Sequence, residues 1–347
     1  MTAKKFRFSK FISEYKAYVL VALVLILGIF ANNFFTVRNF TSLLNSTVLL
    51  AMLGAAFTIC LIAGQLDLSV GAIANMAGVV VMGFHTLLGF GWVESFFIAV
   101  FAGFVVGLIN GLLVCKAKIH SFITTLGMSF VLRGLMFIFM RQAGGGAEIG
   151  AGGDFTFTNW FRHTIGETMF SRQTIIALVC VIVLAILLAR TRWGRNIYMV
   201  GGNAETAWLA GIKRDFTVIS TFSISGLFCA IGGAMFAVVA ASAQPLMGEA
   251  GIPPLMVALA ATIIGGTSVS GGKGSVWKTY VAVFGLMAMF NALTPIVGRF
   301  EIVILANGLI LAACVLYETI RIYYADKKIG IRSALLEERA RELYSKK

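Results

Sequence analysis

The sequence has few charged residues, and their scarcity excludes an ordinary soluble globular protein. Charged side chains make up 12% of the 347 residues, whereas hydrophobic side chains make up 59%. The mean hydropathy of +0.91 is far from that of a soluble domain. The composition therefore indicates an integral membrane protein.

Metal-binding and catalytic patterns are also missing. The three histidines, His85, His120 and His163, are far apart without ligand spacing, and the chain has no HExxH or GxSxG motif. The cysteines show no paired or CxxC spacing, and each falls within or at the end of an apolar run: Cys60, Cys115, Cys180, Cys229 and Cys314. We expect no metal ion, no disulfide and no catalytic residue.

A nucleotide-binding motif is absent as well. Residues 263–277, IIGGTSVSGGKGSVW, fail the phosphate-loop pattern GxxxxGK[ST], because Gly272 stands where Lys is needed and no Ser or Thr directly follows Lys273. We prefer to interpret this stretch as a flexible helix break at the membrane surface. The chain by itself is not expected to hydrolyse ATP.

Long apolar runs are abundant, and a membrane-spanning helix needs about 20 such residues. Clear candidates lie at about 17–35, 42–64, 96–115, 120–140, 173–189, 217–241, 276–297 and 301–320. Two Gly-rich stretches, about 70–90 and 254–270, are open to three interpretations: full spans, broken helices or re-entrant segments. We expect an all-α polytopic membrane protein with about ten transmembrane helices, one or two of them broken or re-entrant.

Lys and Arg explain the net charge of +13, because they gather in the polar segments between apolar runs. All these segments become cytoplasmic when about ten spans are threaded from an inside N-terminus, so both termini are predicted to be cytoplasmic. The chain then divides into a basic tail (1–16), a transmembrane domain (17–320) and a C-terminal tail (321–347). The charge requires no nucleic-acid partner.

The segment at about 141–172 falls outside in this threading and forms the longest external loop. It is rich in Gly and carries Glu148, Asp154 and Glu167. A contact surface for a soluble partner and a Gly-rich connector are both consistent with this composition.

A polar segment at about 190–216 lies on the cytoplasmic side between two apolar runs. Asn203 is a good N-cap, Glu205 places negative charge in the first turn, and Gly211 can end a helix. This pattern predicts a helix of about two turns. Four residues fall on one predicted face: Ala204, Ala207, Trp208 and Gly211. A docking element and a solvated loop with one helical turn both remain open.

The segment 63–78, AGQLDLSVGAIANMAG, places Asp67 between two apolar stretches. A carboxylate there is costly unless it is paired, hydrated or capping a helix, so Asp67 is a functional candidate. Alternatively, Asp67 or Ser69 is the N-cap of the next helix and has a structural role only.

Five segments, in this order, resemble the permease subunits of bacterial ATP-binding-cassette importers for sugars, of the ribose, xylose and galactose permease type. They are LDLSVG at 66–71, GLINGLLVCKAKIHSFITTLGMSFVLRG at 107–134, TRWGRNIYMVGGNAETAWLAGI at 191–212, SGLFCAIGGAMF at 225–236 and IIGGTSVSGGKGSV at 263–276. The resemblance covers nearly the whole chain. It departs at Gln65, where the family usually has a second Gly, and at His120 and Ser121, where Pro is frequent.

The resemblance implies a homodimer or heterodimer of permeases in the bacterial cytoplasmic (inner) membrane. It also implies a separate cytoplasmic ATPase, which uses the ATP, and a periplasmic sugar-binding protein that delivers the solute. No cofactor is implied for this chain. On the family pattern, residues 201–212 would be the coupling helix that enters a cleft of the ATPase.

A sugar is uncharged and polar, so its path needs scattered hydroxyl, amide and aromatic groups. Candidates are Asn45, Ser46, Asp67, Ser69, Asn75, Asn110, Thr124, Thr125, Ser129, Arg133, Asn291 and Asn307. An interhelical hydrogen bond is the alternative for each hydroxyl and amide. Arg133 is open to three roles: lining the path, pairing with an acid, or reaching to the interface.

An ion-coupled secondary transporter of a small polar solute is the alternative function. It requires a membrane-embedded acid in a relay, and only Asp67, with Glu301 and Glu318 near span ends, is available.

Overall fold

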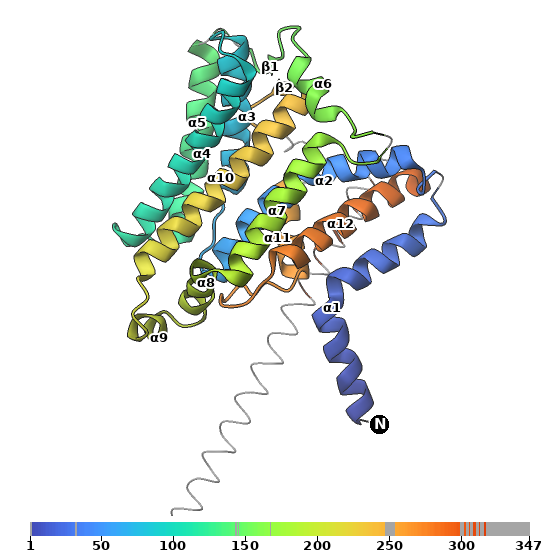
Figure 1. Cartoon of the computed structure of the whole chain (residues 1–347), viewed down its shortest axis with the longest axis vertical. Coiled ribbons are helices and arrows are strands. Elements are labelled where there is room, and N and C mark those ends of the chain that lie inside the picture. Colours follow the sequence, from blue (N-terminus) through green and yellow to red (C-terminus); the bar gives the residue numbers. More distant parts are fainter. Residues whose placement is uncertain are drawn as a thin grey trace, which may run out of the picture. The chain divides into compact units, whose positions relative to one another are not determined.

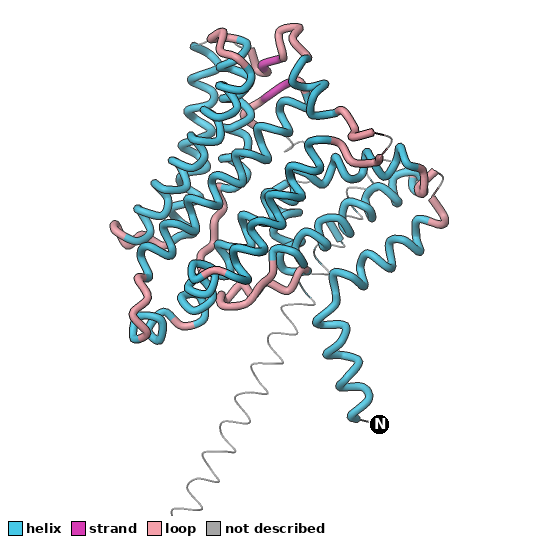
Figure 2. The backbone as a smooth tube through the Cα atoms, viewed as in Figure 1, coloured by secondary structure: helices cyan, strands magenta, loops and turns pink. Residues whose placement is uncertain are grey.

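The computed structural model of the chain describes residues 2–298, apart from residues 32, 143, 145, 167 and 247–253, and a few isolated positions after residue 298. In this part of the chain nearly all regular structure is helical, with two short strands (Figure 2). The predicted all-α class is confirmed.

Figure 1 labels the elements in chain order. The helices are α1 (Thr2–Gly28), α2 (Val37–Ile62), α3 (Val70–Thr86), α4 (Trp92–Cys115), α5 (Ser121–Gln142), α6 (Thr156–Arg162), α7 (Arg172–Arg190), α8 (Arg192–Gly202), α9 (Ala204–Leu209), α10 (Arg214–Ala240), α11 (Pro254–Ile264) and α12 (Val276–Val297). The strands β1 (Ile149–Gly150) and β2 (Ser242–Ala243) pair antiparallel, which joins the chain after α5 to the chain after α10.

Six helices within the described residues are long and apolar enough to cross a membrane: α2, α4, α5, α7, α10 and α12. Each corresponds to a run that the sequence predicts as a span, which confirms a polytopic membrane protein. The predicted span at 301–320 lies outside the described residues. The total of about ten spans and the cytoplasmic side of both termini stay predictions.

The first predicted span, 17–35, is wrong in its extent. Helix α1 has a non-helical kink at Tyr15 and ends at Gly28, so its apolar part covers Tyr15–Gly28 only. A series of turns follows, and the ring of Phe34 packs so closely over Gly28 that a Cβ there would overlap it. The apolar stretch after Gly28 therefore folds back, a reversal that hydropathy alone does not reveal.

The two Gly-rich stretches form short helices. Helix α3 has 17 residues and α11 has 11. At the helical rise they extend over about 25 Å and about 16 Å, less than the roughly 30 Å hydrocarbon core. Helix α11 is too short for a full span and runs into a loop at 265–275, which confirms the predicted helix break there.

Helices α2 and α10 occupy the centre of this bundle. Helix α2 packs against α7, α10, α11 and α12, while α10 also packs against α3 and α4. A Cβ on Gly226 would overlap the carbonyl oxygen of Gly103, and one on Gly233 would overlap that of Ala74. The small residues in 225–236 therefore allow close helix packing.

The outer helices α4, α5 and α7 carry exposed apolar side chains, including Phe101, Phe130 and Ile186. In a membrane protein such faces meet lipid or another membrane chain. The short elements lie at the two ends of the bundle, with α8 and α9 at one end and β1, β2 and α6 at the other (Figure 1).

Candidate functional site

The polar segment at 190–216 folds as two helices, α8 and α9, before α10 begins. Asn203 caps α9, because its Oδ1 accepts a hydrogen bond from the backbone N–H of Thr206 at 2.9 Å. Gly211 has a φ of +76°, the left-handed conformation that ends the segment. The cap and the stop that the sequence predicts are both confirmed, although α9 itself has only six residues.

Helix α8 was not predicted from the sequence. Its N-cap is Thr191, whose hydroxyl accepts a hydrogen bond from the N–H of Gly194 at 3.1 Å. Trp193, Ile197 and Val200 repeat at i, i+4 and i+7, and the last two are buried. A capping residue followed by this apolar pattern was the available signal. Helix α8 packs against α7, α9 and α10, and it thereby connects α9 to the rest of the bundle.

Three of the four residues predicted to share a face, Ala204, Trp208 and Gly211, line one groove, but Ala207 does not join them. Ala207 is 1% exposed, whereas Trp208 is 70% and Leu209 74% exposed. The chain reverses after α9, and the N–H of Ile212 donates to the carbonyl of Ala207 at 3.0 Å. The reversal covers Ala207 and leaves Trp208 and Leu209 pointing away, which a helical wheel of an isolated helix cannot reveal.

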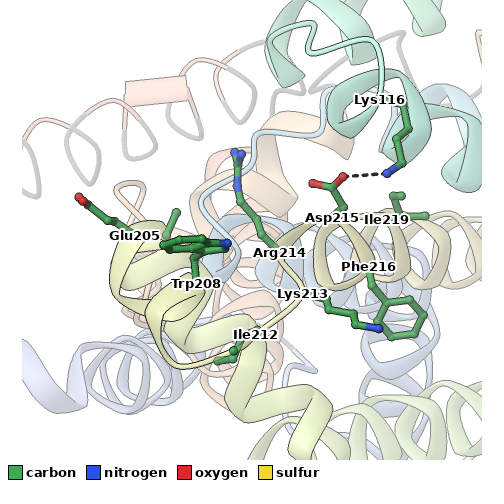
Figure 3. A pocket seen from close by; sticks show the side chains of 11 residues that line it. Lys116, Glu205, Trp208, Ile212, Lys213, Arg214, Asp215, Phe216 and Ile219 are labelled. Atoms are coloured by element: carbon green, nitrogen blue, oxygen red, sulfur yellow. Dashed lines mark hydrogen bonds and ion pairs between the residues drawn. The ribbon is translucent and has the colours of Figure 1, made fainter.

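A groove of about 850 Å³ lies between α9, the start of α10 and the end of α4 (Figure 3). It is lined by Lys116, Ala204, Glu205, Trp208, Gly211, Ile212, Lys213, Arg214, Asp215, Phe216 and Ile219. Lys116 Nζ lies 2.9 Å from Asp215 Oδ2, and this hydrogen-bonded pair raises the pKa of Lys116. Nothing in the sequence indicates this pair, because its members are 99 positions apart. Exposed rings beside both signs of charge are typical of a surface that contacts another protein.

Asp67 lies in the non-helical break between α2 and α3 and is fully buried. Its Oδ1 accepts hydrogen bonds from the N–H and hydroxyl of Ser69, at 3.0 and 2.5 Å, and its Oδ2 accepts one from the Ser225 hydroxyl at 3.1 Å. Asn110 donates to the Ser69 hydroxyl at 2.9 Å. Three predicted candidates, Asp67, Ser69 and Asn110, thus meet in one cluster. Ser69 holds the N-cap position of α3, but its hydroxyl bonds Asp67 rather than the helix backbone.

A row of hydroxyl groups on α5 binds the backbone of the same break. The N–H of Leu66 donates to Ser121 Oγ at 3.3 Å, and that of Leu68 donates to Thr125 Oγ1 at 2.9 Å. The Ser129 hydroxyl donates to the carbonyl of Leu68 at 3.1 Å. Spaced four residues apart, these side chains replace the helical hydrogen bonds that the break lacks. Thr125, a predicted path residue, therefore binds the backbone of the break between α2 and α3.

A cavity of about 220 Å³ lies between α2, α3, α5 and α11. It is lined by Leu49, Leu53, Leu68, Gly71, Ala72, Ala74, Asn75, Ser129, Arg133, Pro254, Leu255 and Met256. The cavity brings together the predicted path residues Asn75, Ser129 and Arg133. Asn75 also donates to the carbonyl of Pro245 at 3.3 Å. A mainly apolar wall with a few polar groups is typical of a small-molecule site.

Asn291 does not reach this cavity. Its side-chain amide pairs reciprocally with that of Asn39, with N···O distances of 2.9 and 3.0 Å, and both line a separate pocket. Asn45 likewise accepts a hydrogen bond from Ser171 on α7's N-cap. Both asparagines form contacts between helices, the alternative that the sequence left open. Asn307 lies outside the described residues.

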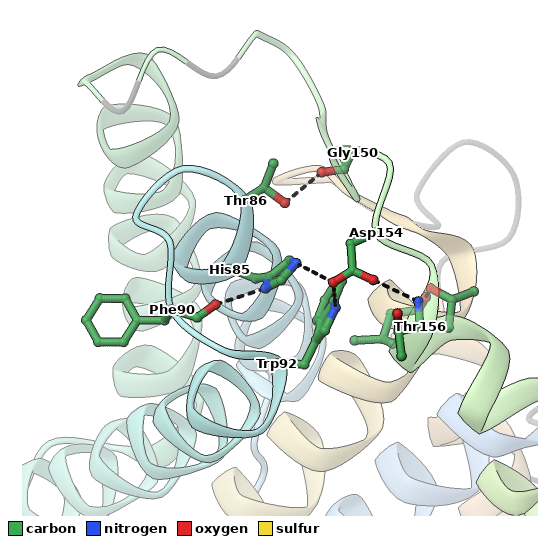
Figure 4. A network of polar contacts seen from close by, with 9 residues as sticks. His85, Thr86, Phe90, Trp92, Gly150, Asp154 and Thr156 are labelled. Carbon is green, nitrogen blue, oxygen red and sulfur yellow. Dashed lines mark hydrogen bonds and ion pairs between the residues drawn. The ribbon is translucent and has the colours of Figure 1, made fainter.

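The opposite end of the bundle carries an ordered cap within 141–172 (Figure 4). Asp154 accepts hydrogen bonds from the Trp92 indole N–H and the N–H of Thr156, both at 2.9 Å. Bonding to Thr156, then to Trp92, lowers the pKa of Asp154. His85 Nε2 lies 3.5 Å from Asp154 Oδ2, and the His85 ring stacks on Trp92. The segment is thus tied to α3 and α4 rather than serving as a loose connector.

In the part of the chain that the structure describes, no group of three or more His, Cys, Asp and Glu side chains comes together. Cys60, Cys115, Cys180 and Cys229 are free thiols there. Cys314 lies outside the described residues.

Known proteins resemble this chain over most of its length. The model of a family described as branched-chain amino acid transport system / permease component matches residues 39–319. The D-allose transport system permease protein AlsC of Escherichia coli (strain K12) is 31% identical over 90% of this chain and 94% of its own. The L-arabinose transport system permease protein AraH of the same organism is 31% identical over 90% and 92%. The ribose import permease protein RbsC of Bacillus subtilis (strain 168) is 32% identical over 79% and 82%.

Proposed function

The chain belongs to the family of branched-chain amino acid transport system / permease components, and we propose that it is the permease subunit of an ATP-binding-cassette importer for a sugar or sugar-like solute. As a permease it is a transport subunit and not an enzyme. The comparisons give no support to an ion-coupled transporter, the alternative that the sequence left open.

A sugar is favoured over an amino acid as the solute. Similar permeases are named for D-allose, L-arabinose, ribose and fructose, others are named for autoinducer 2, and none of these is named for an amino acid. The cavity fits this class, since Asn75 and Ser129 offer an amide and a hydroxyl within a mainly apolar wall. Arg133 also lines it and is the group that an amino acid's carboxylate would require. Measuring whether the partner binding protein binds sugars or amino acids separates the two solute classes.

The single observation that carries the proposed coupling role is the exposure of α9. Trp208 and Leu209 are 70% and 74% exposed at the tip of the bundle end, next to a groove with charged walls. Adjacent exposed apolar side chains with a polar rim mark a contact surface. We assign this surface to a cytoplasmic ATPase, with Asn203, Ala204, Glu205, Trp208 and Gly211 building it and the buried Ala207 packing beneath it.

The remaining parts of the importer follow from the same proposal. ATP is bound and used by the ATPase, and this chain binds no cofactor. A second permease, identical or different, completes the path, and a periplasmic binding protein delivers the solute to the end that carries α6. The complex resides in the bacterial inner membrane. Transport then needs two packed states of the permease with a gap of a few kcal/mol, biased by the ATPase through α9.

The test is capture of the importer's cytoplasmic ATPase by full-length permease in detergent. Replacing both Trp208 and Leu209 with Asp should abolish co-purification of the ATPase and uptake in proteoliposomes. Phe155→Asp, made in an exposed side chain at the N-cap of α6 and therefore at the opposite end of the bundle, is the matched control for added surface charge. It should leave capture of the ATPase intact. Undiminished capture by the double variant would remove α9 from the interface.

A further inference from the structure

Three segments that are distant in the sequence meet directly beside α9. They are the end of α2 with the start of the break (62–64), the end of α8 (201–202) and the loop between α11 and α12 (271–274). We call their meeting point the glycine junction, because glycines from all three segments make its close contacts. Gly202 immediately precedes Asn203, the N-cap of α9, so the junction directly adjoins the start of α9.

The contacts in the junction are backbone against backbone. A Cβ on Gly201 would overlap the carbonyl oxygen of Ile62, and one on Gly271 would overlap the carbonyl oxygen of Gly201. A Cβ on Gly272 would lie 2.6 Å from Gly202 Cα. Backbones this close cannot slide past one another independently, because no flexible side chain lies between them to give way.

Two hydrogen bonds lock the same three segments together. The N–H of Gly272 donates to the carbonyl of Ile62 at 2.9 Å, which joins the α11–α12 loop to α2. The Tyr198 hydroxyl donates to the carbonyl of Gly274 at 2.9 Å, which joins α8 to the same loop. Tyr198 is on α8 one turn before Gly201, so α8 is attached to the loop at two successive turns.

The junction also connects to the solute cavity on two sides. Helix α11 leads from the loop to the cavity, which Pro254, Leu255 and Met256 line at its other end. Helix α2 contributes Leu49 and Leu53 to the wall, and the break after α2 contributes Leu68. Any displacement of α8 and α9 at the junction therefore acts on the elements that form the cavity.

We infer that the glycine junction passes movement of α9 to α11 and to the α2–α3 break, and that Tyr198 and Gly201 are positioning residues for coupled transport. This inference rests on the proposed ATPase contact at α9. It differs from that contact because neither Tyr198 nor Gly201 lines the docking groove. The α11–α12 loop, which looks like a failed phosphate loop in the sequence, thereby gains a mechanical role.

The decisive variant is Tyr198→Phe, studied in the complete importer with its ATPase and binding protein in proteoliposomes. It removes one hydroxyl and leaves the ring in place, so folding and capture of the ATPase should be unchanged. Losing a single hydrogen bond shifts an equilibrium by about fivefold. We therefore expect the amount of solute moved per ATP hydrolysed to fall about fivefold, with ATP hydrolysis itself retained. Tyr280→Phe, at a tyrosine on α12, is the matched control.

A second variant, Gly201→Ala, tests the backbone contact. Its Cβ forces α8 away from α2, and transport per ATP should fall further than in Tyr198→Phe. Gly134→Ala on α5 is the control, since a Cβ there meets nothing within 4 Å. If Gly201→Ala prevents folding, Tyr198→Phe alone decides.

The outcomes separate the inference from the proposed function. An unchanged transport-to-hydrolysis ratio in Tyr198→Phe, with the ATPase bound, overturns the role of the junction and leaves the α9 contact standing. Loss of ATPase capture in that variant also overturns it, since the junction would then only support α9. A wild-type complex that captures no ATPase would overturn the proposed function itself.

Discussion

The two ends of the bundle use aromatic side chains in opposite ways. At the α6 end, Trp92 stacks on Phe157, which in turn packs edge-on against Phe161, and Trp92 and Phe161 are buried. At the α9 end, Trp208 and Leu209 stand more than two-thirds exposed. The α6 end packs its rings mostly against one another, although Phe155 and Trp160 are 49% and 44% exposed, whereas the α9 end leaves Trp208 far more exposed.

This difference indicates that the α6 end contributes to stability and that the α9 end contributes to coupling. A self-packed cap with hydrogen-bonded polar groups adds to the stability of the chain, whereas exposed apolar groups add nothing until a partner covers them. Variants in the cap should therefore change stability, and variants around α9 should change coupling. The following predictions use that contrast.

The largest effect is expected from Trp92→Ala, at the start of α4, where the indole contacts the cap. The substitution empties a buried site, ends stacking on His85 and leaves Asp154 without the indole N–H. Truncating a buried aromatic residue costs about 3–5 kcal/mol, so the melting temperature in detergent should drop strongly. Trp92→Phe keeps a ring and should lose less. Capture of the ATPase by the surviving folded protein should be normal, and if it were lost the two ends would not be independent.

A smaller effect, confined to coupling, is expected from Gly211→Pro. Proline fixes φ near −65°, about 140° from the observed conformation of Gly211, and removes the N–H that donates to the carbonyl of Trp208. Uptake should fall at least about tenfold, because α9 loses its defined end, at a local cost of about 3 kcal/mol. Membrane insertion and melting temperature should not change. Gly211→Asn tolerates the left-handed conformation and should retain most uptake; equal loss in both variants would contradict this account.

A milder variant at the same end is Asn203→Ala. It removes the N-cap hydrogen bond to Thr206, which is worth about 1 kcal/mol to a helix. Uptake should decline by at most about fivefold, since the loss of about 1 kcal/mol lowers the folding equilibrium constant of α9 by that factor. Asn203→Ser retains a capping oxygen and should restore uptake. No decline in Asn203→Ala would show that α9 gets its order from the partner instead.

The smallest effect concerns pH and the cap. The pKa of Asp154 is lowered by hydrogen bonds in the folded chain, so the unfolded chain binds the proton more readily. The resulting stability is present above the ordinary carboxyl value of 3.8 and is lost as pH falls through the lower folded value. Between about pH 6 and about pH 3, the melting temperature should therefore fall slightly more for the native chain than for Asp154→Asn. Because Asp154 is exposed, solvent screening keeps the difference small. Identical slopes would show that Asp154 contributes nothing to the cap.

The sequence predicted those features that depend on local patterns. Hydropathy located the helices that are long enough to span a membrane, and Asn203 and Gly211 marked the ends of α9, since capping and left-handed turns are set by neighbouring residues. The predicted span at 17–35 extends beyond the end of helix α1, because that end depends on Phe34 folding back onto Gly28.

Features that join distant segments were beyond prediction from one sequence. Asp67 could be recognised as a costly buried acid, but its partner Ser225 lies 158 positions away. Asn75 and Arg133 reach one cavity whereas Asn291 pairs with Asn39, and nothing in their surroundings in the sequence distinguishes them. The double glycines at 201–202 and 271–272 are equally visible as letters, yet only the fold shows that they meet.

The hydroxyl row on α5 has a consequence for which parts can move. Pulling the α2–α3 break away from Ser121, Thr125 and Ser129 would strip partners from polar backbone groups inside the protein, and each such group costs several kcal/mol where water is absent. The break and α5 are thereby expected to move together as one unit. Any movement that reaches the break from the glycine junction would then carry α5 with it, while α11 faces this unit across the cavity.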